Sequence, residues 1–375
     1  MRLRTLALVA LGLLTAACSG SDGADTETAP EASEDEVRVD TRSPEARRQY
    51  DANVAFALGY TARCKSNGSR PRVLVTGFGR FMSIGNNATG RIVSTLVPNA
   101  RYPETEAPAD GEVDPPDPQL SVATATIDIA GIGPVDVCGM ILPVYWDLAA
   151  ILIAKEVAAF DPAMVLMNGV AGGRQPLWIE MGAYNRAAKL DDGSNQLRPA
   201  PKANEDLAKI IESAPKSEDA HPNLLSWRAV ERAARDAVHS HADATEANTR
   251  FGALLPDVKL AGFPRTSNTY LCNNVTYVTS WLMSHPSREV RLLRANTTER
   301  NKPNEVRIKM AKDFSKVPRV FVHWPSELAD KHHAAGADVM KAIVTAQLTA
   351  TKAGDLPSKG DNTLADPSLA GGDFF

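Results

Sequence analysis

The chain has 375 residues, of which 43% are hydrophobic and 23% are charged, and its formal net charge is −4. This length exceeds that of one small domain but fits one large domain with flexible ends. The apolar residues are numerous enough to bury a sizeable core. The weakly negative charge gives no electrostatic reason to expect a nucleic-acid partner.

Residues 1–17 are predicted to be a signal peptide rather than part of the fold. Two arginines precede an apolar run at 6–14 that is too short to span a bilayer stably. The run Leu13-Leu14-Thr15-Ala16-Ala17-Cys18 resembles the lipobox of bacterial lipoproteins, in which the cysteine is lipidated. That resemblance implies a protein exported and held by lipid on Cys18 at the periplasmic or extracellular face of the cell membrane. The alternative is an ordinary secretory signal that is cleaved near Cys18.

Residues 18–43 are predicted to form a disordered, acidic tether. Eight acidic residues and one basic residue lie between 19 and 40, without apolar periodicity, so burial cannot offset the entropy of ordering this segment. The stretch 353–375 is rich in Gly, Pro, Asp and Ser and is also predicted to be loose. The folded body is therefore expected at 44–352.

Within this body, short apolar runs alternate with helical patterns. Strands are predicted at 73–75, 122–129, 140–142, 164–167 and 319–322, and helices at 146–160, 224–240 and 337–349. This alternation favours an α/β fold with three layers, in which helices cover both faces of a largely parallel, twisted sheet. Ligands of such sheets bind beyond the carboxyl ends of the strands, where 77–81, 169–174 and His323 are expected.

The four cysteines divide by expected role. Cys18 is the lipidation site, and Cys272 must stay free if it is a nucleophile. Cys64 and Cys138 then remain as a possible disulfide, which an oxidising compartment permits.

Cys272 lies at the predicted start of a helix, after the turn-forming residues 265–269 and before apolar residues spaced by three and four. The positive end of a helix dipole favours thiolate over thiol, and its unpaired N–H groups can hold an oxyanion. These properties suit a nucleophile. The alternative is a small apolar cysteine buried in the core.

His323 ends a predicted buried strand and is the best placed of the seven histidines to act as a base. The other six flank helices or precede prolines. The sequence has no CxxC or HExxH motif, so we predict no metal site and no cofactor. A nucleotide site at 169–173 is disfavoured because neither a P-loop Lys-Ser/Thr nor GxGxxG is present.

Four motifs, in order, resemble those of pyroglutamyl peptidase I, the pyrrolidone carboxyl peptidase family. They are a TGFxPF-like loop in 73–81 followed by Asn87, a GxAGGR-like segment at 169–174 followed by Glu180 and Asn185, the cysteine segment 269–273, and the histidine segment 321–325. The likeness covers about residues 70–350. It implies the same fold and a cysteine exopeptidase that acts on small peptides.

By that resemblance, Cys272 is the nucleophile, His323 is its general base and Glu180 is the third member of the triad. An adjacent imidazole activates a weakly ionised thiol, and a carboxylate fixes the tautomer of that imidazole. The implied reaction removes an N-terminal pyroglutamyl residue through a thioester, which water then hydrolyses.

The resemblance also implies substrate-binding residues. Phe78 and Phe81 match family aromatics that pack against the flat lactam ring, and Asn87 matches a family asparagine. Without the resemblance, two phenylalanines three residues apart after a strand are more simply interpreted as a core pair.

Three positions depart from the family pattern: Arg80 replaces a proline, Val170 a glutamine and Leu190 an arginine. Two alternative functions therefore stay open. The first is a hydrolase on the same fold that acts on another amide or peptide terminus. The second is a surface-binding lipoprotein with a vestigial triad. The sequence gives no indication of oligomeric state.

Overall fold

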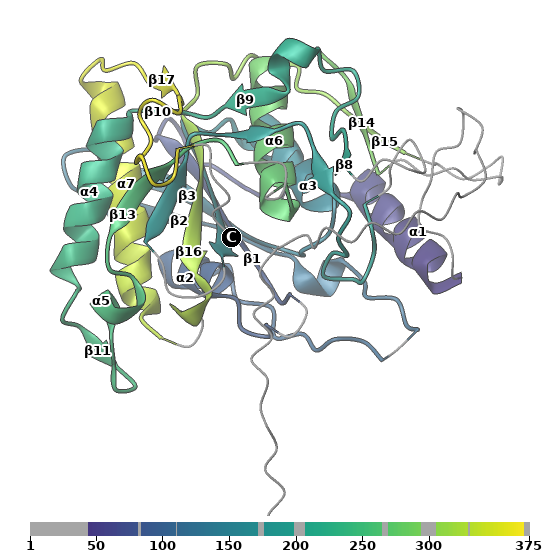
Figure 1. Ribbon diagram of the computed structural model, residues 1–375, viewed down its shortest axis with the longest axis horizontal. Coiled ribbons are helices and arrows are strands. Elements are labelled where there is room, and N and C mark those ends of the chain that lie inside the picture. The colour runs from purple at the N-terminus through teal and green to yellow at the C-terminus, as the bar shows by residue number, and fades with distance from the viewer. Residues whose placement is uncertain are drawn as a thin grey trace, which may run out of the picture.

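A sheet of nine strands forms the middle layer of the part of the chain that the structure describes (Figure 1). The structure is a computed structural model, and it describes residues 44–81, 84–109, 111–171, 176–198, 207–264, 269–293, 305–328 and 331–370. Residues 1–43, including the predicted signal peptide and Cys18, lie outside this part.

Seven strands follow one another across the sheet. Their order is β13 (Val258–Ala261), β5 (Leu177–Glu180), β16 (Arg319–Pro325), β4 (Met164–Ala171), β1 (Arg72–Phe78), β3 (Gly133–Leu142) and β2 (Ser121–Ile129). The four central strands β16, β4, β1 and β3 are parallel. The strand β2 is antiparallel to β3, and β5 is antiparallel to β16 but parallel to β13.

Two short strands, β10 (Leu224–Leu225) and β17 (Ser358–Lys359), complete this sheet. Four small two-stranded sheets accompany it. They pair β6 (Gly182–Tyr184) with β9 (Ala220–Pro222), β7 (Ala187–Ala188) with β8 (Leu207–Ala208), β11 (Thr245–Glu246) with β12 (Thr249–Arg250), and β14 (Val290–Leu292) with β15 (Val306–Ile308).

Helices cover both faces of the sheet. One layer consists of α1 (Pro44–Gly59), α3 (Leu148–Phe160) and α6 (Leu271–Ser284), and the other of α2 (Ala88–Leu96), α4 (Trp227–Ser240) and α7 (His333–Lys352). Figure 1 shows α4 and α7 on the left of the sheet and α1, α3 and α6 on its right. A short helix, α5 (Phe251–Leu254), follows β12.

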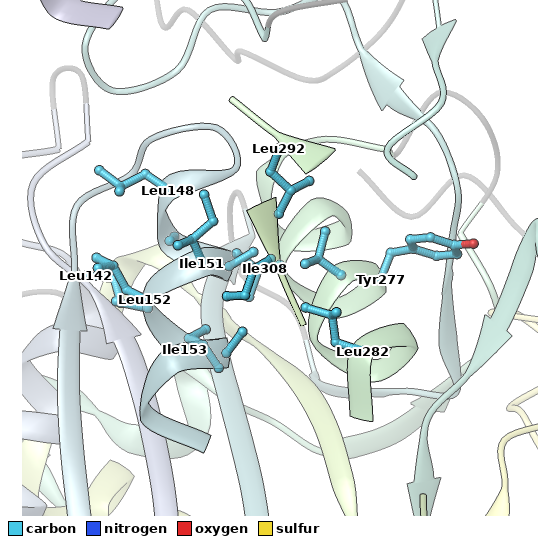
Figure 2. Close-up of a cluster of buried hydrophobic side chains, with 14 of the residues drawn as sticks. Leu142, Leu148, Ile151, Leu152, Ile153, Tyr277, Leu282, Leu292 and Ile308 are labelled. Carbon is cyan, nitrogen blue, oxygen red and sulfur yellow. The ribbon is translucent and has the colours of Figure 1, made fainter. Parts of the chain in front are cut away.

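Alternation along the strands divides their side chains between two apolar cores. On β16, Val320, Val322 and Trp324 belong to the core under α2, α4 and α7, whereas Phe321 belongs to the core under α3 and α6. His323 therefore has the same orientation as Phe321. Figure 2 shows the α3–α6 core, where Leu and Ile side chains of α3 meet those of α6. Burying each such side chain contributes about 1.5–3 kcal/mol to stability.

The three-layer α/β fold with a largely parallel sheet, predicted from the sequence, is confirmed. The predicted apolar runs became β1, β2, β3, β4 and β16, and the predicted helices became α3, α4 and α7. The helix α1 was not predicted, because its mixed polar sequence has little apolar periodicity.

The C-terminal strap, by which we mean residues 355–370, differs from the prediction of a loose tail. Its strand β17 pairs with β10, and the Trp227 indole donates to the Ser358 carbonyl at 2.9 Å. Gly360, which follows β17, lies so close to Met181 that an added Cβ would be 1.9 Å from the Met181 carbonyl oxygen. Gly, Pro, Asp and Ser, which suggested disorder, are here the residues of tight turns against a sheet edge.

Cys64 and Cys138 form a disulfide with Cα atoms 5.7 Å apart, which ties the segment before β1 to the middle of β3. The buried Glu156 carboxylate holds the same segment, because it accepts from the Arg63 and Cys64 backbone N–H groups at 2.7 and 3.0 Å. Among the helices that the structure describes, none combines the length and apolar character required to cross a membrane.

Candidate active site

Cys272 is the second residue of α6 and lies over Gly169 of β4. A Cβ added to Gly169 would lie 2.8 Å from Cys272 Sγ and 2.7 Å from Phe321 Cζ, so only glycine leaves room for the thiol. Gly169 is the direct partner of His323 across the β4–β16 pair. The sulfur therefore lies beside His323 at the carboxyl ends of two central strands, and at the positive end of the α6 dipole.

His323 and Glu180 form a buried pair. His323 Nδ1 lies 2.8 Å from Glu180 Oε1, and the two residues are only 3% and 4% exposed. The contact is diagonal, because the direct partner of Glu180 on β16 is Phe321. With Nδ1–H donating to Glu180, the imidazole presents Nε2 as the nitrogen that can take a proton from the thiol.

The charge of His323 depends on its two neighbours. Burial alone would lower its pKa, but the negative charges of Glu180 and Cys272, together with hydrogen bonds to both side chains, raise the pKa to about 10. Opposite charges at hydrogen-bonding distance favour the protonated form in this way. The site therefore favours an imidazolium between a carboxylate and a sulfur.

Asn273, next to Cys272, ties α6 to the segment that follows Glu180. Its Oδ1 accepts from the Tyr184 N–H at 2.8 Å, and its Nδ2 donates to the Tyr184 and Arg186 carbonyls at 2.8 and 2.9 Å. Asn185, which follows Glu180 in the family-like motif, has a similar role. Its Nδ2 donates to the Ile211 carbonyl, and its Oδ1 accepts from the Ile211 N–H. Both asparagines therefore position the backbone around the site.

A buried carboxylate, Asp147, supports α6 one residue further on. Its Oδ1 accepts from Asn274 Nδ2 and from Arg198 Nε, each at 2.8 Å, and its Oδ2 accepts from the Leu293 N–H at 3.0 Å. Asp147 is fully buried and has a positive φ of 57°. Sequence reasoning missed this group, because Arg198 lies in the segment 190–220 that matched no family motif.

Three aromatic side chains form a wall next to the start of α6. The Phe81 and Tyr270 rings have centroids 6.0 Å apart, and Tyr270 meets Trp146 edge to face at 5.1 Å. The Trp146 backbone N–H donates to the buried Asp192 carboxylate at 3.0 Å, and its indole N–H donates to the Leu190 carbonyl at 2.9 Å. This aromatic wall, Phe81, Trp146 and Tyr270, contains one predicted substrate-binding residue and two that were not predicted.

The other two predicted substrate-binding residues have structural roles. Phe78 is 3% exposed and packs in the α3–α6 core, which agrees with the core interpretation left open by the sequence. Asn87 is the N-cap of α2, where its side-chain oxygen accepts from the Thr89 N–H at 3.1 Å and from the Thr89 hydroxyl at 2.8 Å. Its side chain is committed to capping.

The departures from the family pattern have local explanations. Arg80 is buried and forms an ion pair with Asp114 at 2.6 Å. Val170 is half-buried against the α2–α4–α7 core, and Leu190 is 40% exposed. The rest of the glycine segment, 172–174, lies outside the described residues.

The opposite end of α6 holds a second group of histidines. His221 Nε2 lies 3.2 Å from both the Ser280 carbonyl and Ser284 Oγ, and Arg319 donates to the same hydroxyl. Burial, with the nearby charges of Arg319 and His285, lowers the pKa of His221 to about 3. In the described part of the chain, no three His, Cys, Asp or Glu side chains gather as metal ligands.

Comparisons with known proteins give matches among solved structures. No protein-family model and no curated protein matches the chain. The chain is similar to pyroglutamyl peptidase I from Bacillus amyloliquefaciens (14% identity, TM-score 0.45, covering 75% of this chain and 98% of that chain). Pyrrolidone carboxyl peptidases from Thermococcus litoralis (18%, 0.45, 76% and 96%) and Pyrococcus furiosus (17%, 0.44, 74% and 98%) are similar in the same way. Because these TM-scores are below 0.5, we infer function from the geometry of Cys272, His323 and Glu180.

Proposed function

We propose that the protein is a cysteine hydrolase of amide bonds, in which Cys272 is the nucleophile, His323 the general base and Glu180 the group that orients the imidazole. One observation carries this proposal. A Glu180–His323 pair at 2.8 Å is buried at the strand ends, and the Cys272 sulfur lies beside it over Gly169. Nucleophile, base and orienting group are the parts that such chemistry requires.

The steps follow from this arrangement. The Cys272 thiolate attacks the amide carbonyl, and the oxyanion that forms is stabilised by the N-terminal N–H groups of α6. The C–N bond breaks as the His323 imidazolium gives its proton to the departing amine, leaving a thioester. Water then attacks the thioester while His323 removes its proton, the C–S bond breaks, the acid departs, and the Cys272 thiolate and the His323 imidazolium are restored.

For the substrate, we propose an N-terminal pyroglutamyl residue of a small peptide. The motif resemblance supports this choice, and Phe81 and Tyr270, the partly exposed members of the aromatic wall, offer flat apolar surfaces that suit a lactam ring. Phe81, which is partly exposed, is the residue of the predicted pair that can contact the ring, since Phe78 is committed to the core. Arg80, which forms a buried ion pair with Asp114, stands next to Phe81 where the family has a proline. The second candidate substrate is therefore a different amide terminus.

The test is hydrolysis of pyroglutamyl-aminomethylcoumarin by the purified protein and by its Cys272→Ser and His323→Ala variants. We expect each variant to lose at least about 10³-fold in kcat/KM. The exposed His239 provides a control, and His239→Ala should keep full activity. If the wild type does not turn over this substrate but iodoacetamide modifies Cys272 faster than a free thiol at neutral pH, the substrate is another amide. A Cys272 that is neither active nor unusually reactive would contradict the hydrolase and favour a surface-binding lipoprotein.

We further propose that Cys18 is lipidated and holds the exported protein at the membrane surface. The lipobox-like sequence supports this, and a Cys64–Cys138 disulfide suits an oxidising compartment outside the cytoplasm. Metabolic labelling with palmitate should mark the wild type and not Cys18→Ser. An unlabelled, released wild-type protein would contradict the proposal.

A further inference from the structure

The C-terminal strap closes the outer edge of the sheet at β13. An edge strand exposes backbone N–H and C=O groups that have no partner strand. Two residues of the strap form hydrogen bonds with such groups on β13 and on the residue that follows it. The Asp366 N–H donates to the Leu260 carbonyl, and the Gly262 N–H donates to the Leu369 carbonyl, each at 2.9 Å. Lys259 of β13 also pairs with Asp366 at 3.6 Å. The strap is thus fixed along β13 as far as Leu369.

Leu369 packs into a small apolar cluster that is separate from the two main cores. The buried members of this cluster are Ala171, Trp178 and Ala261, which end β4, lie on β5 and end β13. Trp178 is two residues before Glu180 on β5, so both side chains project from the same face of the sheet. Leu369 therefore covers the sheet on the face that carries the Glu180–His323 pair.

Trp178 in turn contacts the imidazole. It is the direct antiparallel partner of His323, and the two rings meet edge to face with centroids 6.4 Å apart and planes at 89°. Phe321 meets the same imidazole at 4.9 Å and 63°. With Nδ1 held by Glu180, the ring of His323 has aromatic contacts that limit its rotation.

We propose that the C-terminal strap is a positioning element of the active site. In this proposal Leu369 holds Trp178, and Trp178 keeps the imidazole in the orientation that directs Nδ1 to Glu180 and Nε2 to Cys272. The inference rests on the proposed thiol chemistry of Cys272 and His323. It assigns to Leu369 and Trp178 an effect on the rate that acts through His323 rather than through contact with substrate.

The main test is the rate at which iodoacetamide alkylates Cys272, measured by peptide mass spectrometry from pH 5 to pH 10. Leu369→Ala should slow alkylation at neutral pH by about tenfold and shift its pH profile toward that of a small free thiol. Leu369→Met, which keeps an apolar side chain of similar volume, should restore the wild-type profile. The matched control is Leu356→Ala, because Leu356 lies in the same strap but is 81% exposed and should leave the profile unchanged.

A second measurement is steady-state kinetics. On pyroglutamyl-aminomethylcoumarin, Leu369→Ala should lower kcat by a similar factor and leave KM nearly unchanged, because the lost contact does not touch substrate. If the wild type does not cleave that substrate, the alkylation profiles alone decide the role of the strap. Leu369→Ala with a lower melting temperature but an unchanged pH profile would overturn the positioning role alone. A wild-type Cys272 no more reactive than a free thiol would overturn the thiol chemistry and this inference together.

Discussion

A buried histidine lies beside each end of α6, and the two histidines have opposite electrostatic settings. At its start, His323 is buried against the Glu180 carboxylate and its pKa is raised to about 10. At its end, His221 is buried beside the cation Arg319 and its pKa is lowered to about 3. Burial lowers the pKa of both imidazoles, so the difference comes from the sign of the neighbouring charge.

This contrast shows why burial or residue type alone does not identify a catalytic base. Only His323 combines burial with a carboxylate on one nitrogen and a sulfur near the other. His221 bonds the Ser280 carbonyl and Ser284, which are neutral partners of a neutral ring. The surroundings at the start of α6 therefore stabilise a charged His323, whereas those at its end keep His221 neutral.

The variant with the largest expected effect is Glu180→Gln, which removes the carboxylate beside His323. The amide cannot stabilise an imidazolium as a carboxylate does, so we expect kcat/KM to fall by about 10³–10⁴-fold in the pyroglutamyl-aminomethylcoumarin assay. The matched control is Glu218→Gln, which removes the carboxylate that pairs with His285 at the end of α6. A loss of less than tenfold in Glu180→Gln, or an equal loss in Glu218→Gln, would contradict the role of Glu180.

The same variant changes how stability depends on pH. Because the folded pKa of His323 lies above the ordinary 6.5, its contribution is complete below pH 6.5 and is lost as pH rises through about 10. Urea unfolding between pH 6.5 and 10 should therefore show a flatter decline in Glu180→Gln than in the wild type.

The support beneath the start of α6 gives the next largest effect. Asp147→Ala leaves the Arg198 guanidinium, which is 6% exposed, without its carboxylate, and it also removes the partner of Asn274. We expect the free energy of unfolding to fall by about 3–5 kcal/mol in urea titrations. In the control Asp117→Ala, which breaks the exposed Arg63–Asp117 pair, the loss should be below about 1 kcal/mol. Similar losses in the two variants would argue against the Asp147 network.

The last effect, at the end of α6, is negligible at neutral pH and grows as the pH falls. Since the folded pKa of His221 lies below the ordinary 6.5, the unfolded chain takes up a proton more readily, and stability is lost as pH falls from 6.5 toward 3. His221→Gln removes this proton uptake. Its free energy of unfolding should therefore decline less steeply over that range than that of the wild type, with a difference in slope of at most about 1.4 kcal/mol per pH unit. His239→Gln, on the surface, should keep the wild-type slope, and the same slope in His221→Gln would refute the assignment.

Much of the fold was predictable because its central strands are continuous apolar runs. Residues 73–75, 164–167 and 320–322 are apolar and buried on both faces of the sheet, which is the pattern typical of a parallel sheet. The order of Glu180, Cys272 and His323 along the chain was also visible. The pairing of β5 with β16 brings Glu180 to His323, and α6 places Cys272 over Gly169, the partner of His323 on β4.

Other features depend on contacts that a local pattern does not reveal. Phe78 is buried in the α3–α6 core, whereas Phe81, past the strand end, is only partly buried against that core and contacts Tyr270, although both matched the same motif. Trp146 and Trp178 approach the site through pairings distant in sequence. The C-terminal strap has the composition of a flexible tail, and its hydrogen bonds with β13 and β10 and the packing of Leu369 distinguish it from one.

The Cys64–Cys138 disulfide has a practical consequence for preparing the protein. The described residues contain these two cysteines and the free Cys272. Apart from Cys18, reduction and denaturation release three thiols, which can join in three pairwise ways, of which one is native. Oxidative renaturation therefore competes with two scrambled forms that both consume Cys272. Cys272→Ser eliminates both of these mispairings, so this variant should be simpler to recover from inclusion bodies than the wild type.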